Sequence, residues 1–333
     1  MVFMSLLAML LIILVAAEIF TNALEHLGEK LRISDGVTGS IFAAVGTALP
    51  ETSVPIIALL AGTANQHTNE EIGVGAILGA PLMLSTLSIS LMALSVLKTR
   101  GATGHLRPEK TGLIRDLNFF ILSFSFSIGA LFVPHSRIEV RGALGLVMLL
   151  TYFIYLYLTI RSSKSLVEDG HATEADSPML LNRLGFPNNF LVILLQLSIG
   201  LTMLVAGAKG FISGVQAASL ILGVSPLLLS LIVIPIATEL PEKVNSILWI
   251  RKGKDTLAFG NITGAMVFQG TLLPAIGIML TPWTPRPEVS AGLIITMVAS
   301  VWVRFIISLG AIRVWHLWVN GILYFVYLLI VLN

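Results

Sequence analysis

The sequence predicts an all-α polytopic membrane protein whose ten transmembrane helices form two inverted five-helix repeats. Three observations predict this fold: an extreme apolar composition, ten apolar stretches of spanning length, and matching motifs in the two halves. Of the 333 residues, 56% are hydrophobic and 11% are charged. Soluble domains carry about 25% charged residues. The chain is therefore too poor in charge to cover a globular surface, and a soluble protein is excluded.

A spanning helix needs about 20 predominantly apolar residues. The predicted spans are 2–24, 36–61, 71–97, 113–133, 138–161, 188–212, 221–250, 255–281, 288–309 and 312–332. The segment between the fifth and sixth spans is polar and rich in acidic residues. The predicted domains are a first repeat over 1–161, a cytoplasmic linker loop over 162–187 and a second repeat over 188–333.

The distribution of Lys and Arg between the loops predicts the orientation. With the N-terminus outside, fourteen of them fall in cytoplasmic loops and three in extracytoplasmic loops. Positive charge concentrates on the cytoplasmic side, so we expect both termini to be extracytoplasmic in a cell (inner, cytoplasmic) membrane. The net charge of +2 is too small for a nucleic-acid-binding surface. The absence of cysteine excludes thiolate metal sites and disulfides.

The two halves carry matching motifs in the second span of each repeat. Residues 46–51 read Gly-Thr-Ala-Leu-Pro-Glu, and residues 237–242 read Ala-Thr-Glu-Leu-Pro-Glu. The next span of each repeat also matches, as Gly-x-Ile-x-Gly-Ala over 75–80 and 260–265. Five spans per repeat make the halves inverted relative to one another. Inverted repeats with proline-broken helices are typical of secondary transporters.

Both motifs can offer oxygen ligands inside the membrane. A helical proline frees the carbonyl four residues earlier, and residues spaced i and i+4 share a helix face. The candidate ligands are thus the carbonyls of Gly46 and Ala237, the hydroxyls of Thr47 and Thr238, and the carboxylates of Glu51 and Glu242. Oxygen-only sites suit hard cations such as Ca²⁺ and Na⁺. The alternative is that both glutamates are protonated and hydrogen-bond between packed helices.

Four further residues add charge near these motifs. Glu239 places a second carboxylate in the second motif, and Lys243 follows Glu242 directly. Lys243 is a gating or coupling candidate that could compete with a cation; its alternative is a side chain that reaches the interface or another carboxylate. Glu18 and Lys209 each lie 33 residues before a motif glutamate. They are gating candidates, and the alternative is a structural ion pair between them.

With these motifs and spans, the sequence resembles the calcium/cation antiporter superfamily, the group of sodium/calcium exchangers, over essentially the whole chain. The resemblance implies a central ion site built by spans 2, 3, 7 and 8, over which spans 1 and 6 slide. It maps the motif glutamates and threonines of the family onto Glu51, Glu242, Thr47 and Thr238. The family has a polar ligand in the third span and another in the eighth, and the matching residues here are Leu84 and Gln269. Gln269 therefore joins the candidate ligands. The first half of the site is poor in oxygen, because leucine offers none.

The predicted function is secondary active antiport of Ca²⁺ for Na⁺ or H⁺ by alternating access. Because family ligands are missing, exchange of another cation (Na⁺, K⁺, Mg²⁺ or H⁺) remains an alternative. An ion channel is a further one, although the continuous polar stripe of a channel is absent. The sequence shows no nucleotide-binding loop and no catalytic constellation, so an enzyme is not expected. Metal cations and the lipid bilayer are the expected partners; no cofactor or soluble partner is implied, and the oligomeric state is open.

Overall fold

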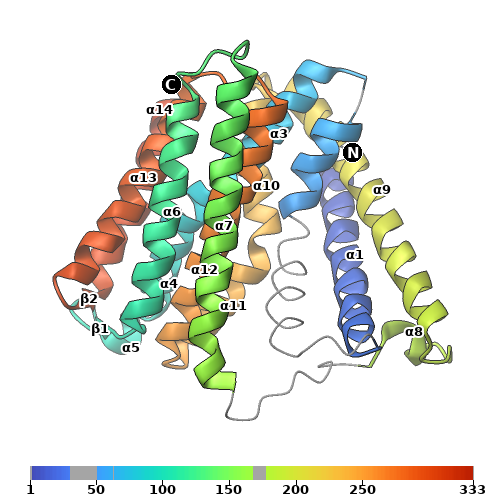
Figure 1. Ribbon diagram of the computed structural model, residues 1–333. Coiled ribbons are helices and arrows are strands. Elements are labelled where there is room, and N and C mark those ends of the chain that lie inside the picture. The colour runs from blue at the N-terminus through green and yellow to red at the C-terminus, as the bar shows by residue number, and fades with distance from the viewer. Residues whose placement is uncertain (1, 31–50, 63, 168–177, 333) are drawn as a thin grey trace. The chain divides into compact units, whose positions relative to one another are not determined.

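The computed structural model describes residues 2–30, 51–62, 64–167 and 178–332, and these are almost entirely helical (Figure 1). Among them, eight helices are long and apolar enough to cross a membrane. Two shorter apolar helices, Glu51–Ala61 and Pro226–Ile236, accompany them. The prediction of a multi-pass all-α membrane protein is confirmed.

The chain divides into two compact units, and each combines segments from both halves of the sequence. The first unit comprises residues 1–69 and 156–223, and the second comprises 70–155 and 224–333. The first unit contains α1 (Val2–Lys30), the helix Glu51–Ala61, α8 (Leu180–Arg183) and α9 (Phe190–Leu222).

Helices α1 and α9 pack closely and antiparallel in the first unit (Figure 1). A Cβ added to Gly200 of α9 would lie 2.9 Å from the backbone nitrogen of Phe20 in α1. Gly207 faces Ile13 and Gly214 faces Leu6. Residue numbers therefore increase along α9 as they decrease along α1, and the two helices are antiparallel. Small residues that let backbones approach are the usual basis of helix packing in membranes.

A buried amide pair ties α1, α8 and α9 together at one end of this unit. Gln196 Nε2 donates to the carbonyl of Ile19 over 3.0 Å and to Asn22 Oδ1 over 2.9 Å. The backbone amides of Leu180 and Leu181 donate to Asn22 Oδ1 and Gln196 Oε1, each over 2.9 Å. Buried polar groups must be paired in this way to avoid a desolvation cost.

The second unit holds most of the helices. They are α3 (Gln66–Met83), the π-helical turn η1 (Leu84–Ser88), α4 (Ile89–Ser95), α5 (Leu97–Arg100), α6 (Lys110–Ala130), α7 (Ile138–Val167), α10 (Pro226–Thr238), α11 (Leu240–Arg251), α12 (Asp255–Leu280), α13 (Pro287–Ser308), the 3₁₀ turn η2 (Val314–Leu317) and α14 (Trp318–Leu332). The first turn of α3 and the end of α7 belong to the first unit. Helix α12 packs against α6 and α11, and α13 packs against α6 and α14.

Two short strands join one end of this unit. Strand β1 (His105–Leu106) pairs antiparallel with β2 (Ile312–Arg313). Figure 1 shows these strands together with α5, at the end where α6 begins and α13 finishes. These strands are not predictable from the sequence, because two-residue strands leave no periodic pattern.

Helix ends in the second unit are satisfied by side chains. The carboxylate of Glu109 accepts from the backbone N–H groups of Thr111 and Gly112, both over 2.6 Å, and so caps α6. These bonds, that from Gly112 foremost, lower the pKa of Glu109. At the C-terminal end of α12, buried Arg141 donates to the carbonyls of Ile278 and Pro282, each over 2.9 Å. Arginine thus pairs carbonyls that the helix itself leaves free.

The predicted boundaries differ from the structure in the middle of the chain. The sixth span, predicted over 188–212, is α9 and extends to Leu222. It ends because Gly223 adopts a left-handed conformation with φ of 67°. The seventh span, predicted to begin at 221, therefore begins at Pro226. The polar residues that ended the apolar run in the sequence stay helical because α9 packs along α1.

Candidate cation site

The seventh span is broken at Glu239, within the second proline motif. Helix α10 ends at Thr238, α11 begins at Leu240, and Glu239 lies between them as a single-residue turn. Pro241 occupies the first turn of α11, where its missing N–H is not needed. The break that the proline predicted is therefore present. It turns a helix interior into two helix ends, with buried carboxylates beside them.

Glu239 and Glu242 form a buried carboxylate pair at this break. A carboxylate oxygen of one lies within 4.8 Å of a carboxylate oxygen of the other. Gln269 of α12 donates from Nε2 to Glu239 Oε1 over 2.7 Å. Among the residues that the structure describes, Oε2 of each glutamate and Oε1 of Gln269 have no hydrogen-bond partner. The carboxylate pair and Gln269 thus leave three oxygen atoms available to a ligand.

Lys243 is also buried, and it reaches back across the break. Its Nζ donates to the carbonyl of Pro235 over 2.9 Å and lies 2.9 Å from Met83 Sδ in α3. The close crossing of α3 and α10 allows this contact, because a Cβ on Gly79 would lie 2.4 Å from the Leu231 carbonyl oxygen. The glycines of the first Gly-x-Ile-x-Gly segment are thus required by packing. The ammonium group of Lys243 is therefore held inside the protein rather than at its surface.

Asn261 holds α11 against α12 behind the carboxylates. Its Nδ2 donates to the backbone carbonyl of Glu242 over 3.1 Å and to Ser246 Oγ over 2.9 Å. Two residues along, Thr263 faces a different side and donates to Asp116 Oδ2 over 2.7 Å. The two polar side chains of α12 therefore serve different contacts.

The other candidate residues are distributed as follows. Thr238 is buried, and its hydroxyl donates to the Ile234 carbonyl over 3.1 Å, so its oxygen lone pairs remain available. Ala237 lies in the last turn of α10. Glu51 begins the helix Glu51–Ala61 of the first unit. Gly46 and Thr47 lie outside the described residues.

Glu18 and Lys209 lie in α1 and α9 of the first unit, and both are exposed. Within the described ranges the predicted ion pair between them is not present. The side chains lie on outer faces of a helix pair whose contact is made by the glycines of α9.

Asp116, a buried acid within α6, was not among the predicted site residues. Besides the bond from Thr263, its Oδ1 lies 3.9 Å from Arg115 Nε. The signal was available, because an acid inside the predicted span 113–133 is costly unless it is paired. Asn261 obtains its hydrogen-bond partners only from the packing of α11 on α12.

Buried carboxylate and amide oxygens at a proline-broken helix are typical of membrane transporters that bind cations. The chain belongs to the sodium/calcium exchanger protein family, which it matches over residues 1–161 and 192–333. Members of this family are cation-exchanging transporters rather than enzymes.

Individual relatives agree with this assignment. The chain is 26% identical over 281 residues to the putative antiporter CaxA of Alkalimonas amylolytica, covering 82% of this chain and 79% of that protein. It is 25% identical over 273 residues to the inner membrane protein YrbG of Escherichia coli (strain K12), covering 82% and 78%. The solved H⁺/Ca²⁺ exchanger CAX shares the fold, with a TM-score of 0.71, 18% identity, and coverage of 98% of this chain and 82% of that one.

Proposed function

We propose that the protein exchanges Ca²⁺ for Na⁺ or H⁺ across a cell membrane by alternating access. The carboxylate pair of Glu239 and Glu242 carries this proposal, because its two Oε2 atoms have no hydrogen-bond partner among the described residues. Two buried anions at bilayer depth are costly unless a cation or proton accompanies them. Membership of the exchanger family supports the same reaction.

The proposed site combines both motifs. Glu242, Glu239, Thr238, the Ala237 carbonyl and Gln269 form the second half, and Glu51, Thr47 and the Gly46 carbonyl form the first. Ca²⁺ takes six to eight oxygen ligands. The first half has Leu84 where the second has Gln269, and Leu84 lies on the π-helical turn η1. Because this half is poor in oxygen, exchange of Na⁺, K⁺, Mg²⁺ or H⁺ is the second candidate.

The repeat organisation is part of the proposal. We assign residues 1–161 and 188–333 to two inverted repeats joined by the linker 162–187. The antiparallel packing of α1 on α9 supports it, since the first span of each repeat should run in opposite directions. These two helices group together in the first unit, whereas α6 and α10 to α14 belong to the second, which supports movement of the pair in alternating access. Glu18 and Lys209 are the gating candidates on this pair.

The orientation can be tested directly because the chain contains no cysteine. Thr103→Cys and Ser136→Cys place single thiols in exposed loops before and after α6. A membrane-impermeant maleimide should label position 136 from outside intact cells and position 103 only after lysis. The reverse pattern would contradict extracytoplasmic termini.

Transport itself is tested in proteoliposomes with radioactive Ca²⁺ and imposed Na⁺ or H⁺ gradients. We expect accumulation driven by one gradient, abolished by Glu51→Gln and by Glu242→Gln. Glu139→Gln is the matched control, because this exposed glutamate lies at the start of α7 and outside the site. Accumulation of another cation under the same gradients would select the second candidate. Flux that only dissipates gradients would identify a channel and refute antiport.

A further inference from the structure

A cavity of about 330 Å³ opens at the end of the second unit where α6 begins and α13 ends. Its lining combines loop residues with the ends of these helices. The lining residues are His105, Leu106, Arg107, Pro108, Lys110, Leu113, Ile307, Gly310, Ala311 and Ile312. A volume of this size is within the range of pockets for small molecules, roughly 300–1,000 Å³.

The charge of the lining is of one sign. His105, Arg107 and Lys110 are exposed basic residues, and none of the lining residues is acidic. Lys110 Nζ donates to the carbonyl of Gly310 over 2.9 Å, which holds the ammonium group at the cavity. Within the described part of the chain, no carboxylate lies within ion-pair distance of any of these three side chains.

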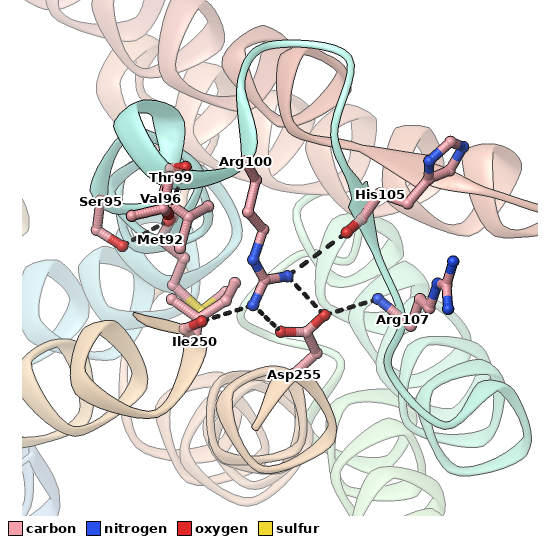
Figure 2. Close-up of polar contacts among 9 residues, drawn as sticks. All are labelled: Met92, Ser95, Val96, Thr99, Arg100, His105, Arg107, Ile250 and Asp255. Carbon is pink, nitrogen blue, oxygen red and sulfur yellow. Dashed lines mark hydrogen bonds and ion pairs between the residues drawn. The ribbon is translucent and has the colours of Figure 1, made fainter. Parts of the chain in front are cut away.

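The carboxylates of Asp255 and Glu109, near the cavity, already accept hydrogen bonds from other groups. Figure 2 shows that the carboxylate of Asp255 accepts hydrogen bonds from both Nη atoms of Arg100 and from the backbone N–H of Arg107. The Arg100 bonds are 2.7 and 2.8 Å long, and the Arg107 bond is 2.7 Å long. The side chains of His105 and Arg107 point away from Asp255 in the same view. Glu109 is bound to two N–H groups as the cap of α6. Among the described residues, neither carboxylate forms an ion pair with His105, Arg107 or Lys110, so these side chains remain available to an anion.

The other wall of the cavity is apolar. Leu106, Leu113, Ile307 and Ile312 line it, and α6 and α13 are spanning helices that end here. The cavity thus lies at the level of a membrane–water interface. Basic pockets between spanning helices at an interface are suited to anionic lipid headgroups. A free phosphate ion would use the cations but not the apolar wall.

We propose that this cavity binds the headgroup of an anionic phospholipid. Arg107 and Lys110 bind the phosphate, and the apolar wall contacts the glycerol esters and the first methylenes of the acyl chains. The inference is independent of the proposed cation site, because the lining residues and the site residues do not overlap.

The test is binding of phosphatidylglycerol and phosphatidylcholine to the purified full-length protein in neutral detergent, followed by native mass spectrometry. We expect preferential retention of phosphatidylglycerol. The variant Arg107→Gln/Lys110→Gln should bind it about 25-fold more weakly, since each interfacial cation contributes roughly fivefold. Lys98→Gln is the control, because this exposed cation at the same end lies outside the cavity.

Arg107→Lys keeps the charge and should retain binding, which separates charge loss from misfolding. Equal retention of both lipids, or unchanged binding in the double variant, would overturn the proposal. Inorganic phosphate distinguishes the source of the ligand. If phosphate displaces the lipid at equal concentration, the cavity is an ion site and the lipid assignment is wrong.

Discussion

Glu239→Gln isolates the electrostatic contribution of one carboxylate at the α10–α11 break. The size and shape of the side chain hardly change. The amide oxygen can still accept the hydrogen bond from Gln269 Nε2, which is 2.7 Å long in the native protein. Packing is therefore preserved, and the variant differs by one negative charge in a buried position.

The magnitude follows from the separation of the carboxylates. The carboxylate oxygens lie within 4.8 Å of each other, and two unit charges at that limit repel by about 3.5 kcal/mol at an effective dielectric constant of 20. The buried positive charge of Lys243 offsets part of this repulsion. We expect the cation-free variant to be more stable than the native protein by roughly 1–3 kcal/mol. A cation in the site loses attraction of similar size, so its affinity should fall by about a hundredfold.

The assay is thermal unfolding of the purified protein at neutral pH, with and without Ca²⁺, Na⁺, K⁺ or Mg²⁺. A ligand that binds the native state raises Tm. We expect Glu239→Gln to raise Tm without cations and to lose most of the cation-induced increase, whereas Glu139→Gln changes neither. A lower Tm without cations, together with an intact cation-induced increase, would refute the reasoning. That result would mean that Glu239 serves helix packing as a protonated group.

Three further predictions concern other parts of the chain. Lys243→Met removes the buried ammonium that competes with a transported cation, so equilibrium binding of that cation should strengthen roughly tenfold; unchanged affinity would remove Lys243 from the site. Gly200→Ala forces a Cβ against the α1 backbone and should cost about 1–3 kcal/mol of stability, whereas Gly142→Ala, where a Cβ meets nothing within 4 Å, should be neutral in the same unfolding assay. The bonds that lower the pKa of Glu109 stabilise the folded protein above pH 4.5, the usual value, and this contribution is lost as the pH falls through the lowered pKa. Glu109→Ala should therefore lower Tm at neutral pH and flatten its decline in acid; a parallel decline would contradict the capping role.

Much of the fold was predictable from composition and from proline. Apolar stretches of spanning length can be stable only as helices in a bilayer, because backbone groups must be paired within the segment. Pro241 predicted the break of the seventh span, since its ring excludes a continuous hydrogen-bond ladder. The length of α9 was not predictable in this way. Its last ten residues include Ser213, Gly214, Gln216 and Ser219, which interrupt the apolar run, and the helix continues where Gly214 packs against Leu6 of α1.

The candidate site was likewise predictable only in part. The sequence by itself determined that Glu239 and Glu242 lie beside a helix break, because residue spacing and proline geometry are local. The tertiary structure alone decided that Gln269 donates to Glu239 and that Lys243 reaches Pro235 and Met83. These contacts join residues on different helices or on opposite sides of a break. Only the crossing of packed helices sets such distances, and no pattern along one helix encodes it.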